Sequence, residues 1–161
     1  WRMKDGRAPS TTPPRLGEIG LGNYEPYLMN RVMGRYNASI RAEMAKLGLT
    51  TPKMRVLAVL SVMDGLLISQ LAVHAITEQS TLSRALDAMQ ADGLVRREAD
   101  PDDSRATRVY MTDTGRSTFE VLWPHMAETY GQMFRGIDED ERHAFLATLR
   151  KVHANIRKHD F

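Results

Sequence analysis

The chain contains no cysteine, and this absence removes several kinds of chemistry at once. A protein without cysteine has no structural disulfide, no thiolate metal ligand, no cysteine nucleophile and no thiol-based redox sensor. No run of about 18 apolar residues occurs, so the sequence predicts no membrane-spanning helix. The opening residues also lack a signal-peptide pattern. We therefore expect a soluble, cytoplasmic protein.

An excess of charge of one sign is also lacking. Twenty-two Lys and Arg residues against 20 Asp and Glu leave a formal net charge of +2. This balance disfavours proteins that hold nucleic acid by broad neutralisation of phosphates, so any nucleic-acid site must be a local arrangement of side chains. Hydrophobic residues make up 42% of the 161 residues, which is enough for the core of one domain.

Motifs of catalysis and metal binding are missing as well. The sequence has no GxSxG, Walker or GxGxxG motif and no HExxH helix. His125 and Glu128 stand three residues apart on a predicted helix and could begin a metal site, but a solvated helix face explains them better. We therefore predict no catalytic residue, no metal and no cofactor, and a protein that is not an enzyme.

Composition and apolar spacing divide the chain into four parts. Residues 1–23 are rich in Pro and Gly and predict a flexible N-terminal arm. Residues 24–47 carry an apolar stripe at helical spacing. Residues 48–112 contain short helices and a hairpin. Residues 113–161 predict two further helices, the first capped by Thr112 and the last starting at Asp138. The predicted fold class is mainly α with a small β-hairpin.

Two short helices joined by a tight turn stand at the centre of the third part. They are predicted at 69–75 and 78–91, with Thr77 as the N-cap of the second. Small and apolar residues that would let them cross closely are Leu71, Ala72, Ala75 and Ile76, and Leu82, Ala85, Leu86 and Met89. Strands at 94–99 and 107–112 then form a hairpin. This order is typical of a winged helix-turn-helix, which places its second helix in a DNA groove.

Polar side chains gather at the start of the second helix, away from its apolar residues: Gln79, Ser80, Thr81, Ser83 and Arg84. The N-terminal residues of a recognition helix meet base edges, and hydroxyl groups and helix N-termini can hold phosphate oxygens. A helix start rich in Ser and Thr is by itself more often a cap or a solvated surface. The DNA-reading hypothesis therefore depends on several features that agree.

The loop of the hairpin is not a simple basic patch, because four arginines and four acids between positions 96 and 108 sum to zero. We interpret Asp103 as the residue that orients Arg105, since an arginine fixed in this way can enter a narrow minor groove. Arg108 is a further candidate for DNA binding by the wing. The alternative for these residues is an ordinary surface ion pair.

These motifs, in this order and spacing, resemble the MarR family of bacterial transcription regulators. The matching segments are residues 68–72, 77–84, 87–95, 100–105 and 109–115. The resemblance implies a homodimer held by its first helix and its last two helices, and release of DNA when a small molecule, often aromatic, binds. It also implies DNA-contacting positions in the second helix and at Asp103 and Arg105. The chain departs from the cysteine-sensing branch of the family.

Dimerisation also has a physical reason, because the apolar stripes at the two ends of the chain need partners and a two-fold dimer would bury both. Residues predicted for this interface are Leu28, Val32, Tyr36, Phe145, Leu149 and Val152. Residues that could line a ligand pocket are Met29, Met33, Tyr36 and Met54. Ordinary core packing is the competing interpretation for each of them.

The function that these observations favour is a sequence-specific transcriptional regulator, a homodimeric repressor that a small molecule releases from a palindromic operator. Its expected partners are double-stranded DNA, a second copy of the chain and an effector, with an aromatic compound as one candidate. The expected location is the cytoplasm, in association with the nucleoid. The alternatives are an architectural DNA binder, which the near-neutral charge disfavours, and a winged-helix protein-interaction module, whose exposed helix should carry apolar anchors.

Overall fold

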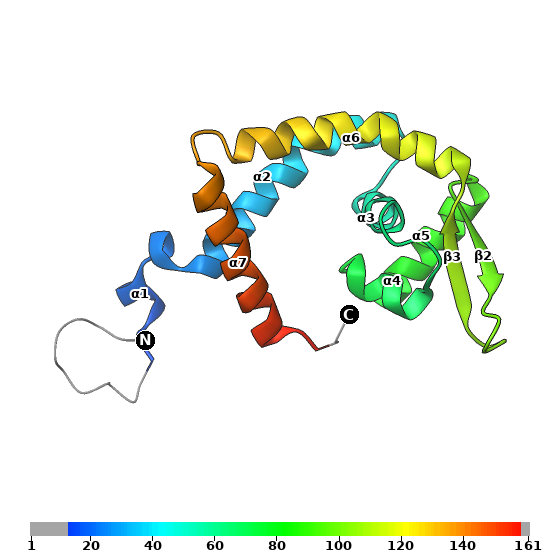
Figure 1. Ribbon diagram of the computed structural model, residues 1–161, viewed down its shortest axis with the longest axis horizontal. Coiled ribbons are helices and arrows are strands. Elements are labelled where there is room, and N and C mark those ends of the chain that lie inside the picture. The colour runs from blue at the N-terminus through cyan, green and yellow to red at the C-terminus, as the bar shows by residue number, and fades with distance from the viewer. Residues whose placement is uncertain (1–12, 159–161) are drawn as a thin grey trace. The chain divides into compact units, whose positions relative to one another are not determined.

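The computed structural model describes residues 13–158 and confirms the predicted fold class (Figure 1). Its helices are α1 (Leu16–Ile19), the 3-10 turn η1 (Leu21–Asn23), α2 (Glu25–Lys46), α3 (Thr51–Leu60), α4 (Ile68–His74), α5 (Gln79–Ala91), α6 (Asp113–Met133) and α7 (Glu139–Ile156). Its strands are β1 (Leu66–Leu67), β2 (Val95–Ala99) and β3 (Thr107–Met111). The chain divides into two compact units, with the boundary inside α2 between Ser39 and Ile40.

Within the segment for which the sequence predicts a flexible arm, residues 1–12 lie outside the described residues, and the described part contains α1 and η1. The backbone N–H of Arg15 donates to Glu18 Oε2 at 3.0 Å, and Asn23 Nδ2 donates to the carbonyl of Ile19 at 3.0 Å. These bonds satisfy backbone groups at both ends of a one-turn helix, which a pattern of Pro and Gly does not reveal.

The second unit contains the winged lobe, whose core is made by apolar residues of α2, α3, α4, α5, α6 and the sheet. The largest fully buried side chains are Ile40, Val56, Leu57, Leu60, Leu71, Leu82, Leu86, Met89, Val95, Val109 and Leu122. Leu82, Leu86 and Met89 follow one another at spacings of four and three, so α5 buries a single stripe and leaves its other faces outside. Each such side chain contributes about 1.5–3 kcal/mol by leaving water.

The turn between α4 and α5 differs from the prediction at two residues. Ile76 has a φ of 50° and is 77% exposed, so it does not pack between the helices. Thr77 does not cap α5; its hydroxyl donates to the carbonyl of Ala75 at 3.0 Å, and Glu78 occupies the N-cap position. The tight turn needs one left-handed residue, at a cost of about 1–2 kcal/mol for a residue with a Cβ. Arg55 of α3 holds this turn by donating to the Ile76 carbonyl at 3.0 Å.

The three strands form an antiparallel sheet in the order β1–β3–β2. Val95 pairs with Met111 and Ala99 pairs with Thr107, so β2 and β3 form the predicted hairpin. Figure 1 shows this hairpin extending from the lobe beside α5. Gly65 precedes β1 with a φ of 73°, and a Cβ there would lie 2.7 Å from the Tyr110 ring. The sheet therefore needs glycine at this position.

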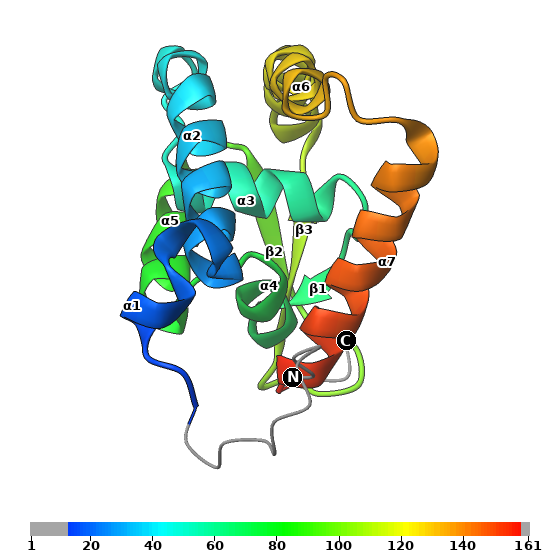
Figure 2. The same ribbon diagram turned by 90° about the vertical axis from the view of Figure 1, so that its left-hand side faces the viewer.

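Both C-terminal helices begin on the side-chain caps that the sequence predicts. Thr112 Oγ1 accepts the backbone N–H of Gly115 at 3.0 Å and Asp138 Oδ1 accepts that of Glu141 at 2.8 Å. Figure 2 shows α7 turning away from the end of α6, and within Glu139–Ile156 no residue is buried. Among residues 13–158, no helix is both long and apolar enough to cross a membrane.

Candidate nucleic-acid interface

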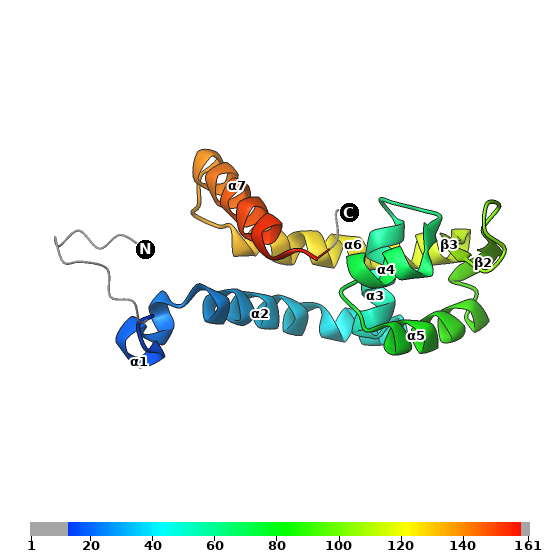
Figure 3. The ribbon, with the colours of Figure 1, turned by 90° about the horizontal axis from the view of Figure 1, so that it is seen from below.

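The predicted recognition residues all lie on the exposed surface of α5: Gln79, Ser80, Thr81, Ser83 and Arg84. Figure 3 shows α5 and the β2–β3 hairpin at the same end of the second unit. The helix can expose this polar surface because its buried stripe, Leu82, Leu86 and Met89, already anchors it to the lobe. The structure thus places the predicted reading residues on one rigid element, as groove recognition requires.

At the wing tip, the predicted contact between Asp103 and Arg105 is present. Asp103 Oδ1 accepts the backbone N–H of Arg105 at 3.0 Å and its Nε–H at 3.2 Å, while the Arg105 side chain is 91% exposed. As an exposed ion pair it contributes little to stability. Its effect is geometric, because a carboxylate on the Nε side leaves the terminal nitrogens of the guanidinium directed outward.

At the wing base, Asp100 organises the loop from a buried position that residue spacing alone does not reveal. Its Oδ1 accepts the backbone N–H groups of Asp102 at 2.9 Å and Asp103 at 3.0 Å, and its Oδ2 accepts Arg108 Nε at 2.5 Å. Arg108 also donates to the carbonyl of Gly65 at 2.8 Å. Arg108 is thus engaged within the fold and holds the loop in place. The available signal was the Asp-Pro pair that opens the loop, a sequence typical of side-chain-capped turns.

Asp100→Asn should remove part of the acid sensitivity of the protein. Hydrogen bonds, first from the Asp102 backbone and also from Asp103 and Arg108, outweigh burial and hold the pKa of the Asp100 carboxyl below its ordinary value. A lowered pKa contributes stability that is present above the unfolded value, about 3.9, and is lost as the pH falls through the folded value. Urea unfolding between about pH 2 and 6 should therefore give a higher free energy of unfolding for wild type than for the variant at pH 6. This difference should become smaller as the pH falls.

Asp102→Asn is the matched control for this experiment, since its carboxylate accepts no hydrogen bond from the described part of the chain. It should follow the wild-type curve. A gap between wild type and Asp100→Asn that stays constant across the whole pH range would contradict the assignment.

A second ion pair joins the hairpin to the recognition helix. Arg97 of β2 donates to Asp87 Oδ1 of α5 at 2.9 Å and approaches the carbonyl of Ser83 at 3.5 Å. On the opposite face of the hairpin, the Arg96 guanidinium lies 4.3 Å from the centre of the Tyr110 ring and pairs with Glu98. The angle between the hairpin and α5 is therefore fixed by the bonds of Arg97 as well as by the short backbone connection between α5 and β2.

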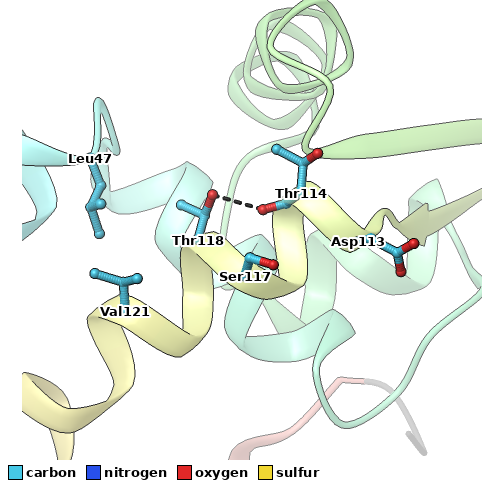
Figure 4. A pocket seen from close by; sticks show the side chains of 6 residues that line it. All are labelled: Leu47, Asp113, Thr114, Ser117, Thr118 and Val121. Atoms are coloured by element: carbon cyan, nitrogen blue, oxygen red, sulfur yellow. Dashed lines mark hydrogen bonds between the residues drawn. The ribbon is translucent and has the colours of Figure 1, made fainter.

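A cavity of about 470 Å³ lies against the first turns of α6 (Figure 4). Its lining residues are Leu47, Asp113, Thr114, Ser117, Thr118 and Val121. In Figure 4, Leu47 and Val121 face each other at one end and the polar side chains follow along α6. None of the residues predicted to line a ligand pocket is among them.

The predicted pocket residues instead lie in different surroundings. Met54 is buried in the lobe core, whereas Met29 and Met33 are exposed on α2. Tyr36 is half-buried, and burial raises the pKa of its hydroxyl, which stays protonated as a hydrogen-bond donor at neutral pH. A ligand site at these four residues remains a prediction.

No group of three potential metal ligands gathers among residues 13–158. His125 Nε2 lies 3.7 Å from Glu43 Oε2. The other carboxylate oxygen of Glu43, Oε1, accepts a hydrogen bond from Lys46 Nζ at 2.8 Å. The bond from Lys46, its charge and that of His125 together hold the pKa of the Glu43 carboxyl below its ordinary value. The contact is an ion-pair cluster between α2 and α6, within the second unit.

The predicted dimerisation residues stand on surfaces that their own unit does not bury. Leu28 and Val32 are 44% and 48% exposed in the first unit, and Phe145 and Val152 are 49% and 40% exposed in the second. Tyr36 and Leu149 are half-buried. Exposed aliphatic and aromatic groups at regular helical spacing are typical of an interface.

A helix-turn-helix, an oriented wing arginine and a hairpin tied to the second helix define this protein as a winged helix-turn-helix regulator of the DNA-binding type. The sequence profile of the MarR family matches residues 47–106. The chain is 59% identical to a MarR-family transcriptional regulator from Silicibacter pomeroyi, covering 92% of this chain and 100% of that one, with a TM-score of 0.87. The chain therefore belongs to the MarR family of transcriptional regulators.

Two further relatives carry functional names. The HTH-type transcriptional repressor IacR of Pseudomonas putida is 29% identical over 89% of this chain and 86% of its own length. The transcriptional activatory protein BadR of Rhodopseudomonas palustris is 31% identical over 70% of this chain and 67% of its own. Similar chains thus include one named as a repressor and one named as an activator.

Proposed function

We propose that this protein is a homodimeric repressor that binds a pseudo-palindromic operator in double-stranded DNA and is released by a small-molecule effector. The observation that carries the DNA-binding part is that the polar face of α5 and the wing arginine Arg105 lie on one rigid lobe. The polar face of α5 suits a major groove, and Arg105, held by Asp103, suits the adjacent minor groove. The similarity to IacR supports repression.

A dimer is supported by the apolar stripe of α7. Phe145, Leu149, Val152 and Ile156 recur at spacings of four and three and leave α7 without a single buried residue in the range Glu139–Ile156. A helix of 18 residues with such a stripe needs a partner surface to be stable in water. A second copy supplies that surface and also the second winged lobe that a palindromic operator requires.

An effector site is supported by the cavity beside α6. One end is apolar, at Leu47 and Val121, and the other carries Asp113 and the hydroxyl of Ser117. An aromatic ring with a polar substituent fits this division. Because α6 begins at the wing and continues away from the lobe, a ligand bound to its first turns is well placed to change the orientation of the lobe relative to the rest of α6.

The experiment that tests the DNA-binding proposal is selection of sites from random duplex DNA, followed by affinity measurement on the selected operator at fixed salt. Arg105→Ala should lower operator affinity about 10- to 100-fold, by analogy with the loss of one specific contact. The dimer should stay intact by light scattering. Arg150→Ala, which removes an exposed arginine from α7, is the control and should bind normally. Unchanged affinity of the Arg105 variant would refute the role of the wing.

A further inference from the structure

Arg84 has a distinct position on α5. With about 100° between successive residues of a helix, its side chain leaves within about 20° of the direction opposite the buried stripe. Thr81 and Ser83 leave on either side of it, and Gln79 lies much closer to the buried stripe. When a recognition helix lies in the major groove, the outermost direction meets the base edges and the flanks meet the phosphates.

The residues around Arg84 leave space for a close approach to DNA. Ser80 stands one turn before it, and Ala88 and Ala91 follow on the same side of α5, all exposed. Because these side chains are short, the helix backbone can approach the floor of a groove while the one long side chain extends ahead of it. A long side chain in a row of short ones is suited to reading a single base pair.

The guanidinium of Arg84 is also available. Asp87, three residues further along α5, is the natural helical partner for it. The structure instead shows Asp87 Oδ1 bound to Arg97 at 2.9 Å, and Arg84 forms no ion pair or hydrogen bond with a side chain of residues 13–158. The arginines of the hairpin differ in this respect, since Arg97 and Arg108 each bind a carboxylate within the fold.

We propose that Arg84 reads a guanine in each half-site of the operator, an inference that rests on the proposed DNA-binding function. A guanidinium presents two parallel N–H groups that match O6 and N7 of guanine in the major groove. The hydroxyls of Thr81 and Ser83, on the two flanks, then face the phosphates of the two groove walls. Arg97 takes part indirectly as a positioning residue, because it holds Asp87 away from Arg84.

The test uses the full-length protein and the operator obtained by site selection. Wild type should enrich a guanine at one symmetric position of both half-sites, and Arg84→Ala should lose that preference while keeping the others. On the operator itself, Arg84→Ala should lower affinity about fivefold to 100-fold. Replacement of that guanine by 7-deazaguanine, which lacks the N7 acceptor, should weaken wild type and leave Arg84→Ala unaffected.

Two comparisons make the outcome decisive. Ser83→Ala, on the flank, should lower affinity for all sequences alike and preserve the guanine preference. A uniform loss for Arg84→Ala, with 7-deazaguanine still weakening its binding, would overturn the inference and make Arg84 a phosphate contact. Failure of wild type to enrich any inverted repeat would instead overturn the proposed function. Circular dichroism of each variant separates loss of reading from loss of fold.

Discussion

Gly115→Ala is expected to destabilise the winged lobe by about 3 kcal/mol or more, with loss of DNA binding at physiological temperature. Gly115 is buried in the first turn of α6, and a methyl group there would overlap the carbonyl oxygen of Leu94 and lie 3.1 Å from the Leu94 carbonyl carbon and from Met111 Cγ. That oxygen already accepts the backbone N–H of Thr112 at 3.1 Å. Neither backbone group can move without separating α6 from the hairpin.

Chemical denaturation provides the measurement, and Gly131→Ala provides the matched control. Gly131 belongs to the same helix but has open space beside it. Apart from the backbone of the helix itself, no atom of residues 13–158 lies within 4 Å of an added methyl group. Alanine is the better helix former, so this variant should gain roughly 0.5–1 kcal/mol. Two variants of equal stability would show that the close approach at Gly115 is not a constraint.

Leu149→Asp is expected to give a folded monomer that binds the full operator at least 100-fold more weakly than wild type. In the monomer, a second winged lobe is no longer held at high effective concentration beside the second half-site. A carboxylate in the middle of the α7 stripe would be buried without a partner in the dimer. In the monomer it costs little, because α7 buries no residue of its own within Glu139–Ile156. Light scattering and operator titration measure the two effects.

Ala147→Asp adds the same charge to the opposite face of α7, where it meets water, and should remain a dimer with normal operator affinity. A Leu149→Asp protein that is still a dimer would contradict the assignment of this stripe to the interface. A Leu149→Asp monomer with full operator affinity would contradict the proposed two-fold recognition.

The elements that the sequence could predict are those fixed by nearby residues. The capping threonine at 112 and aspartate at 138 act within three residues of themselves, and Asp103 holds Arg105 two residues away. The buried stripe of α5 follows from a spacing that any amphipathic helix shows. These local signals were sufficient for the winged helix-turn-helix and for the exposed residues of its recognition helix.

The elements that could not be predicted depend on contacts between distant parts of the chain. The left-handed turn at Ile76 is supported by Arg55, 21 positions earlier, and the wing base depends on Arg108 reaching Gly65, 43 positions away. The cavity beside α6 combines Leu47 with residues from 113 onward. Periodicity describes one element at a time, so partners supplied by another element are outside what it can indicate.

The hydroxyl of Thr112 has a mechanical consequence. It donates to the carbonyl of Gly93, at the end of α5, and accepts from Gly115 in α6, so one atom joins the two helices. Any rotation of α6 must therefore move α5 and the hairpin with it as one rigid body. In the proposed dimer, DNA binding then depends on the distance between the two α5 helices. If the two rigid bodies rotate apart, these helices no longer match half-sites about 34 Å apart. Operators with one base pair inserted at their centre would expose this directly, since the liganded protein should tolerate the longer spacing better than the free protein.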